Sequence, residues 1–192
     1  MNAISRLDFQ HLTAAEARQI RDTVRDVFQR SYVEAIASGD PFEAPDEFMG
    51  RFDAYTDPAR SGDFEYVLAR VDGKPAGQTW GWPLLPNTAW WPALVLDDPK
   101  VDRNGFIEET GNRTFALSEI MVCTEFTGRG LARAMQDELL GGRPEQRATL
   151  LVDPANDRAY ARYLRWGWGK VGTLRPHWPD APNFDVLIRE LR

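Results

Sequence analysis

The chain has 192 residues, of which 43% are hydrophobic and 27% charged, and its formal net charge is −6 at pH 7. This composition is ordinary for a globular protein, and the length predicts a single domain over 1–192. The acidic balance argues against a nucleic-acid partner, which selects basic surfaces, and suits a cationic partner such as an amine.

No apolar run approaches the length of a membrane span, and the polar start does not read as a signal peptide. One cysteine excludes an internal disulfide, and one cysteine with two histidines argues against a dedicated zinc site. We therefore expect a cytoplasmic protein with no membrane partner and no bound metal.

The first residues predict a strand followed by a long helix. Residues 7–12 alternate in polarity as a strand does. Thr13 and Glu16 form the pattern of a capping box, which predicts a helix from Thr13 to about Ala37. The apolar positions of this helix recur at a spacing of four residues: Ile20, Val24, Phe28, Tyr32 and Ile36.

A second helix and a hairpin are predicted next. Residues 45–55 form an amphipathic run whose two phenylalanines are expected to face inwards. Residues 64–71 and 75–84 read as strands, and Asp72-Gly73 between them is a strong signal for a tight hairpin turn.

Residues 85–113 are long for a connection between strands and contain the adjacent pair Trp90 and Trp91. Long connections are usually functional or disordered, and the aromatic content argues against disorder. Two interpretations remain open for this excursion. It forms a wall or roof of a substrate pocket, or it is an interface with a second subunit, as in a homodimer.

The chain is organised around one stretch that reads as strand, glycine turn and helix. The apolar run 115–122 is short enough for a strand and is interrupted by a single carboxylate, Glu119. Gly128 and Gly130 follow, and then an amphipathic run, 131–140. Glycines before a helix leave its first N–H groups open to a ligand, and the helix dipole favours an anion there, usually phosphate.

Three phosphate-binding motifs compete for this stretch. A P-loop requires Lys followed by Ser or Thr after its glycines, and these are absent. A dinucleotide fingerprint requires a small residue where Arg133 stands, so that match is poor. Residues 122–132 instead resemble motif A of the GCN5-related N-acetyltransferases (GNAT family), whose core is [Arg/Gln]-x-x-Gly-x-[Gly/Ala]. Thr127 stands where the family usually has Arg or Gln, and Thr124 where it often has Pro.

Residues 149–168 carry a second resemblance. Residues 149–152 read as a strand, Asp153 as a helix N-cap and Pro154 as the first helical residue, with the helix running over 155–166. Gly167 is placed to end it. Motif B of the GNAT family is matched by Asn156, Ala159, Tyr163, Gly167 and Trp168.

Two motifs in the family's order and at its separation are more specific than either alone, and the resemblance covers about residues 60–190. It implies an α/β fold, with a mixed central sheet of about six to seven strands, helices on both faces and a splayed central strand pair. Residues 146–152, 170–174 and 184–191 are expected to complete that sheet. The loop 175–183 lies near the acceptor site in this family.

The resemblance also implies an activity, the transfer of an acetyl group from acetyl-CoA to a primary amine. The pantetheine arm would bond to the backbone of Ile120, Met121 and Val122, with the Val122 N–H as an oxyanion donor. The remaining cofactor-binding positions implied by the two motifs are Thr127, Gly128, Arg129, Gly130, Leu131, Ala132, Arg133 and Asn156.

Two residues are candidates for the proton transfers. Tyr163 stands where the family has the proton donor to the CoA sulfur, and the alternative is a tyrosine that only packs against CoA. Glu119 is the base candidate, because a carboxylate in an apolar strand needs a partner, water or a task. The alternative is a Glu hydrogen-bonded to its neighbours. A Glu that serves as base elsewhere in the family falls on Leu151 here, and His177 is expected to be an ordinary loop histidine.

We therefore predict an N-acetyltransferase that acts by direct transfer on a small-molecule amine. Two alternatives stay open. One is a catalytically silent acyl-CoA-binding or regulatory domain, and the other is a protein or peptide N-acetyltransferase, which would need an open groove.

Overall fold

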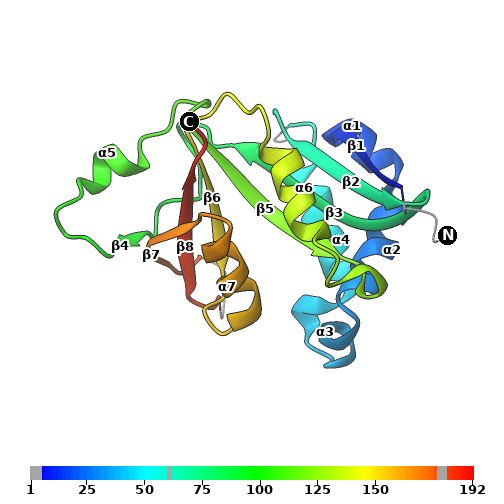
Figure 1. The fold of residues 1–192 in the computed structure, drawn as a ribbon. Coiled ribbons are helices and arrows are strands. Elements are labelled where there is room, and N and C mark those ends of the chain that lie inside the picture. The colour runs from blue at the N-terminus through cyan, green and yellow to red at the C-terminus, as the bar shows by residue number, and fades with distance from the viewer. Residues whose placement is uncertain (1–5, 60–61, 177–180) are drawn as a thin grey trace. The chain divides into compact units, whose positions relative to one another are not determined.

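The computed structural model describes residues 6–59, 62–176 and 181–192, which form a mixed sheet of eight strands with helices (Figure 1). Neighbouring strands pair in the order β1-β2-β3-β5-β6-β8-β7-β4. The strands are β1 Leu7–Thr13, β2 Glu65–Val71, β3 Lys74–Pro83, β4 Val95–Leu96, β5 Thr114–Val122, β6 Arg147–Val152, β7 Gly169–Leu174 and β8 Phe184–Glu190. The helices are α1 Ala14–Gln19, α2 Arg21–Ser31, α3 Val33–Ala37, α4 Pro45–Tyr55, α5 Arg103–Ile107, α6 Leu131–Leu140 and α7 Asp157–Arg165, with 3-10 turns η1 Pro41–Glu43 and η2 Thr124–Phe126.

The predicted α/β class with a mixed sheet is confirmed, and the described sheet has one strand more than the six to seven expected, because the excursion adds β4. The chain divides into two compact units. The first comprises Met1–Trp82 with Glu119–Gly141, and the second Pro83–Ser118 with Gly142–Arg192. Among the described residues, no helix combines the length and the apolar character that a membrane crossing requires.

The long N-terminal helix predicted from Thr13 to Ala37 is wrong, because the chain forms three helices there. Ile20 and Tyr32 leave the helical conformation, with φ/ψ of −104/28° and −110/34°. A spacing of four residues overshoots a full helical turn by roughly 40° at each step. A straight helix would therefore carry its apolar stripe around to the solvent side. The breaks fall on two members of that stripe and let Val24, Val27 and Phe28 of α2 stay buried.

The start of α1 and the β2–β3 hairpin form as predicted. Thr13 and Glu16 make a full capping box at α1. Asp72 and Gly73 have φ of 51° and 80°, the left-handed pair of a tight turn that suits the twist of a hairpin. The strands β1, β2 and β3 are antiparallel.

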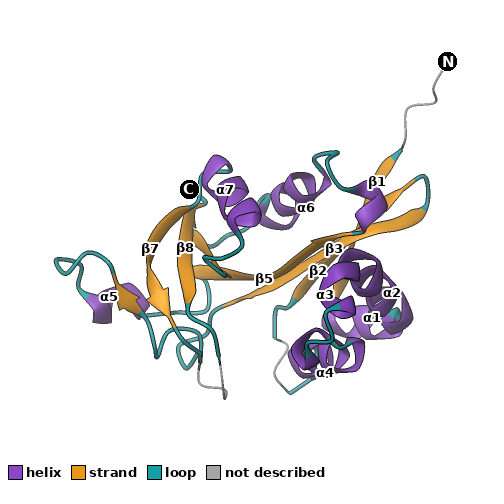
Figure 2. Ribbon diagram, turned by 90° about the horizontal axis from the view of Figure 1, so that it is seen from below, coloured by secondary structure: helices purple, strands orange, loops and turns teal. Residues whose placement is uncertain are grey.

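The core of the first unit is aromatic and lies under α4. The ring of Trp80 on β3 lies 5.9 Å from Phe48 and 5.7 Å from Phe52, the two inward phenylalanines of α4. On the same sheet, Tyr66 lies 5.8 Å from it. Helices α1, α2 and α4 cover one face of β1–β3 and α6 covers the other, as predicted (Figure 2).

In the second unit, β6 pairs antiparallel with β8 along its whole length, and β8 pairs with β7. The parallel pairing of β5 with β6 covers three residues, Thr114–Ala116 against Arg147–Thr149. It ends there, although β6 runs on to Val152 and β5 to Val122. This short pairing agrees with the predicted splayed pair.

The helix of motif B begins later than predicted. Asp153 is not its N-cap. Its carboxylate accepts a hydrogen bond from the N–H of Ala155 at 2.8 Å and forms a turn. Asn156 caps α7 by accepting the N–H of Ala159 at 3.1 Å. Gly167 ends the helix with φ of 88°, as expected.

Candidate active site

The glycine turn before α6 presents free N–H groups. Gly128 and Gly130 both have φ of 78°. A Cβ at either position would meet no atom within 4 Å, so it is the left-handed backbone, and not space, that requires glycine. Gly130 is the N-cap of α6 and has no side chain to cap it, and the first turn of the helix carries no acidic residue. The positive end of α6 is therefore open to an external anion.

The 3-10 turn η2 directly precedes the glycine turn, and its bonds to neighbouring elements stabilise the glycine turn. Glu125 receives hydrogen bonds from the guanidinium of Arg30 on α2 and from Lys74, whose Nζ lies 3.1 Å away. The bonds from Arg30 make the largest contribution to lowering the pKa of Glu125 to about 2, and a backbone N–H and the bond from Lys74 add to it, so Glu125 is charged at neutral pH. The Thr124 hydroxyl donates to the Arg30 carbonyl at 2.8 Å. Sequence reasoning missed this support, since Glu125 lies 95 residues from Arg30 and 51 residues from Lys74 along the chain.

Thr127 stands where the family has a long polar side chain. Its hydroxyl donates to the Thr124 carbonyl at 2.9 Å and so stabilises the turn itself. Arg133, the other expected charge partner of a phosphate, forms an ion pair with Asp137 one turn along α6, at 3.2 Å.

Helix α6 is tied to the sheet by a histidine that the sequence did not single out. His11 on β1 makes hydrogen bonds to Glu65 on β2 at 2.7 Å and to Glu138 on α6 at 2.8 Å. The bond with Glu138 makes the largest contribution to a raised His11 pKa, and Glu65 adds to it. The tie fixes the helix whose N-terminus carries the glycine turn.

The second half of β5 brings Glu119 into the first unit. Its backbone carbonyl accepts the Thr79 hydroxyl at 2.7 Å. Met121, on the same face of the strand, is buried, whereas Ile120 and Val122 are partly buried against the core.

The Glu119 side chain is partly buried, and it makes no hydrogen bond or ion pair with any described residue. Burial raises its pKa to about 7, the nearby Arg51 of α4 opposes this rise, and Glu43 of η1 adds to it. The alternative interpretation, a Glu held by hydrogen bonds from its neighbours, finds no such bond in 6–59, 62–176 or 181–192. A carboxyl that titrates near neutral pH and lacks a partner is suited to accept a proton.

Tyr163 and Asn156 belong to the second unit. The Tyr163 ring meets Trp166 edge-on at a centroid distance of 5.7 Å and Trp168 at 6.2 Å, so two indoles hold its orientation. The side-chain oxygen of Asn156 is engaged in capping α7. His177 lies outside the described residues. In the part of the chain that the structure describes, no group of three or more His, Cys, Asp or Glu side chains is placed to hold a metal ion.

The chain was compared with known proteins. No protein-family model matches it. It is 30% identical over 122 residues to a GCN5-like protein acetyltransferase of Mycobacterium tuberculosis, an alignment that covers 60% of this chain and 58% of that protein. The chain thus matches less than two thirds of that relative's length.

Solved structures share the fold over nearly the whole chain. A protein described as a GNAT-family acetyltransferase from Desulfovibrio desulfuricans gives a TM-score of 0.64 at 17% identity, covering 97% of this chain and 100% of that one. A GNAT acetyltransferase of Elizabethkingia anophelis with acetyl-CoA bound gives 0.58 at 12%, covering 96% and 97%. An aminoglycoside 6′-acetyltransferase gives 0.60 at 12%, also covering 96% and 97%. At these identities the likeness shows the fold, and it confirms the predicted resemblance to GNAT acetyltransferases.

Proposed function

We propose that this chain, which has the GNAT fold and resembles that family in both motifs, transfers an acetyl group from acetyl-CoA to a primary amine. The observation that carries the proposal is Glu119, a carboxyl on β5 that has no partner among the described residues and whose pKa is raised to about 7. An amine arrives as an ammonium ion and must lose a proton before it attacks a thioester. Glu119 supplies the acceptor for that proton at neutral pH.

The donor is acetyl-CoA, the molecule bound to the structural neighbour from Elizabethkingia anophelis. Its pyrophosphate would lie on the N–H groups of residues 128–132, at the uncapped N-terminus of α6, since the Thr127 N–H of the predicted cradle donates to the Thr124 carbonyl at 3.2 Å. The two left-handed glycines support this placement, because they expose N–H groups without a Cβ in front of them. The pantetheine arm would run along Ile120, Met121 and Val122.

The transfer needs three groups. Glu119 takes a proton from the ammonium, directly or through a water, and the nitrogen lone pair forms a bond to the thioester carbon. The Val122 N–H donates to the oxyanion that develops. The oxyanion re-forms the carbonyl as the C–S bond breaks, and Tyr163 donates its proton to the departing thiolate. The second proton that the nitrogen loses as it becomes an amide returns to the Tyr163 oxygen, directly or through a water. The roles of Tyr163 and Val122 are assigned from their positions in motifs B and A, respectively.

The acceptor is proposed to be a small-molecule amine, in keeping with the net charge of −6. A second candidate, an amine on a protein or peptide, is favoured by the relative from Mycobacterium tuberculosis, which is a protein acetyltransferase. The third possibility is a silent acyl-CoA-binding domain. All three candidate functions require acetyl-CoA to bind. They differ in which amine, if any, the protein acetylates.

The test is acetyl-CoA consumption over a panel of polyamines, amino acids, aminoglycosides and peptides, with the Glu119→Gln variant beside the wild type. If the wild type acetylates one class of small amine and Glu119→Gln acetylates it more slowly, the proposal is supported and the acceptor class is identified. Turnover confined to peptides would select the protein acetyltransferase. Stabilisation by acetyl-CoA without turnover of any amine would select the silent domain and refute the enzyme.

A further inference from the structure

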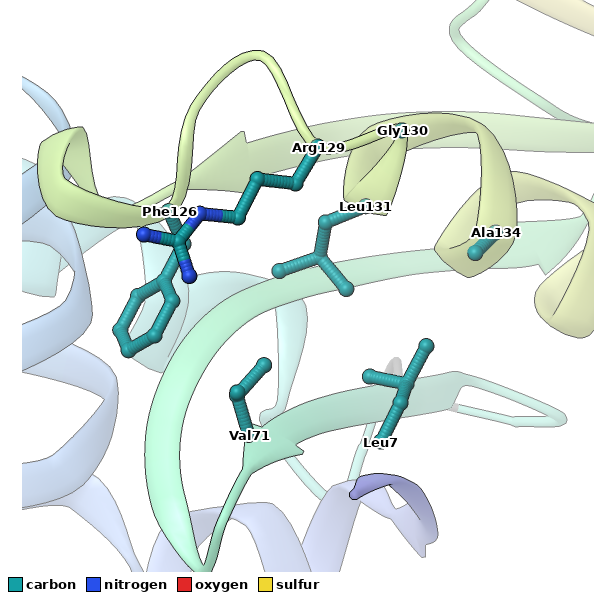
Figure 3. A pocket seen from close by; sticks show the side chains of 7 residues that line it. All are labelled: Leu7, Val71, Phe126, Arg129, Gly130, Leu131 and Ala134. Carbon is teal, nitrogen blue, oxygen red and sulfur yellow. The ribbon is translucent and has the colours of Figure 1, made fainter. Parts of the chain in front are cut away.

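The cavity beside the glycine turn offers no counter-charge to an amine. It holds about 210 Å³ and is lined by aliphatic side chains of β1, β2 and α6 together with Phe126 and Arg129, so the charged group among its described lining residues is a cation (Figure 3). The cavity lies on the face of β1–β3 that α6 covers, whereas α4 covers the opposite face (Figure 2). The charged groups that act on the proposed base, Glu119, come from that opposite side.

These groups belong to α4 and η1, in the same compact unit as Glu119. After the larger effect of burial, Arg51 of α4 lowers the pKa of Glu119 and Glu43 of η1 raises it. Burial also raises the pKa of Glu43, and Arg51 opposes that rise. The guanidinium thus acts on both carboxyls. Within 6–59, 62–176 and 181–192 it forms an ion pair with neither of them.

Arg51 is held in place with most of its hydrogen-bonding capacity unused. Its Nη1 donates to the Phe42 carbonyl at 3.0 Å, and its guanidinium carbon lies 3.9 Å from the centroid of the Phe42 ring. A guanidinium has five N–H donors, and stacking occupies its face and leaves its edge free. In the part of the chain that the structure describes, the Phe42 carbonyl is the one acceptor that Arg51 meets. The Phe42 ring is 48% exposed, so a ligand can reach this side of α4 from solvent.

Unpaired groups of both signs near one reacting centre restrict the ligand that fits. Partly buried charges are costly until a partner neutralises them, and a ligand with both signs neutralises both kinds. An α-amino acid carries its ammonium and its carboxylate on the same carbon atom. A diamine would satisfy the two carboxyls, but it would also bring a second cation towards the unpaired guanidinium of Arg51.

We infer that Arg51 binds a carboxylate of the acceptor, and that the acceptor is an α-amino acid whose amine faces Glu119. The inference rests on the proposed function and names the substrate class of that same site. The planar fork of Arg51 matches the two oxygens of a carboxylate. Glu43 adds negative charge that attracts the ammonium ion before its proton passes to Glu119.

Five L-amino acids with different side chains, namely alanine, leucine, phenylalanine, glutamate and lysine, test this assignment. Each is assayed beside its α-carboxamide, which keeps the amine and lacks the charge of the α-carboxylate. Steady-state kinetics at saturating acetyl-CoA are measured for the wild type, Arg51→Gln and Arg51→Lys. The matched control is Arg25→Gln, which removes the same charge where α2 pairs with Asp46 of α4.

For the amino acid that the wild type uses best, Arg51→Gln is expected to raise KM and to lower kcat/KM about 10- to 100-fold, with little change in kcat, because one charged hydrogen-bonding partner is lost. Arg51→Lys keeps the charge without the fork and should recover part of this loss. The carboxamide should respond to Arg51→Gln no more than to Arg25→Gln. Comparing each variant with the wild type for one acceptor at a time cancels the different basicities of the two amines.

Each other outcome overturns a different statement. If the wild type acetylates no amine, including polyamines, aminoglycosides and peptides, the proposed function fails and the inference fails with it. If amines are acetylated but Arg51→Gln slows an amino acid and its carboxamide equally, the function stands and Arg51 acts only through the charge of Glu119. If spermidine is the better acceptor and Arg51→Gln improves it, the two carboxyls bind a second ammonium and the inference is wrong. Should Arg51→Gln fail to fold, Arg51→Lys decides, because a loss confined to the amino acid supports the inference and an equal loss refutes it.

Discussion

Replacing Glu119 by Gln is expected to lower activity at pH 7 and to raise stability at pH 8, because both effects come from the same carboxylate. Burial raises the pKa of Glu119 from 4.5 to about 7. At about 1.4 kcal/mol per pH unit, this rise corresponds to about 3 kcal/mol against the charged form. That figure is an upper value, since the side chain is only partly buried and water screens its charge.

The direction of the pH dependence follows from the raised pKa. The folded state holds the Glu119 proton more tightly than the unfolded state does. The group therefore favours folding below pH 4.5, and this contribution is lost as the pH rises through about 7. Gln cannot ionise, so its contribution to the stability of the folded state is the same at every pH. The variant should match the wild type at pH 4 and exceed it at pH 8 by up to about 3 kcal/mol.

The activity assay is kcat/KM against pH for wild type, Glu119→Gln and the control Glu47→Gln, an exposed carboxylate of α4. The wild type should lose activity below about pH 7 as Glu119 becomes protonated. The Gln variant should be slower by about two orders of magnitude at neutral pH and recover partly at high pH, where the amine is already free. An acidic limb that the substitution leaves unmoved would refute the role as base. A variant that is less stable at pH 8 than the wild type would refute the burial argument.

Three further expectations concern the turn, the acid and the histidine tie. Acetyl-CoA should raise the melting temperature by mass action where NAD and ATP do not, and Gly130→Asp should abolish this shift, because it forces a left-handed backbone on a charged residue facing the phosphates. Tyr163→Phe should lower kcat about 10- to 100-fold with little change in acetyl-CoA affinity, and an unchanged kcat would leave Tyr163 as packing. His11→Ala should lower the urea midpoint more at pH 6 than at pH 9, since a raised His11 pKa gives stability that is present below its ordinary 6.5 and lost as the pH passes the raised value. An equal loss at both pH values would show that the His11 charge contributes nothing.

The parts of the fold that sequence predicted correctly depend on short-range patterns. The capping box at Thr13 needs two side chains that accept backbone N–H groups three residues apart. The hairpin turn at Asp72-Gly73 and the glycine turn at Gly128 and Gly130 need a left-handed backbone that few residues adopt. The helix breaks at Ile20 and Tyr32 were not predicted. Neither residue is a helix breaker. The breaks can be inferred only from the four-residue spacing of the apolar positions, which would turn the apolar stripe of a straight helix away from the sheet.

The start of α7 shows how two good caps compete. Asp153 and Asn156 both favour an N-cap, and Pro154 is well placed at a first helical position, so the sequence alone points to the earlier start. In the structure the carboxylate of Asp153 closes a turn on Ala155, and Asn156 takes the cap of α7. The motif B asparagine thereby has a structural task besides any role with the cosubstrate, which stays a prediction.

The largest omission was the polar cluster that anchors the excursion 85–113 within the second unit. Glu109 is 4% exposed and accepts hydrogen bonds from Trp91 Nε1 at 2.9 Å and from the Thr114 hydroxyl at 2.7 Å. Arg147 on β6 donates to the same hydroxyl at 2.8 Å and lies 3.4 Å from Glu109. Sequence could not show this, because a buried ion pair looks like two surface charges until its partners are known.

This cluster bears on what the excursion does. Removing one member of a buried pair costs about 3–5 kcal/mol, so Glu109 and Arg147 hold the inner part of the excursion firmly on β5 and β6. A lid would have to break these bonds each time it opened. A fixed wall, whether of a pocket or of a subunit contact, would not. The excursion is therefore a rigid element, whether it forms the wall of a pocket or an interface with a second subunit. Trp91 and Glu109 are part of the core, and any movement is limited to the outer residues of the segment.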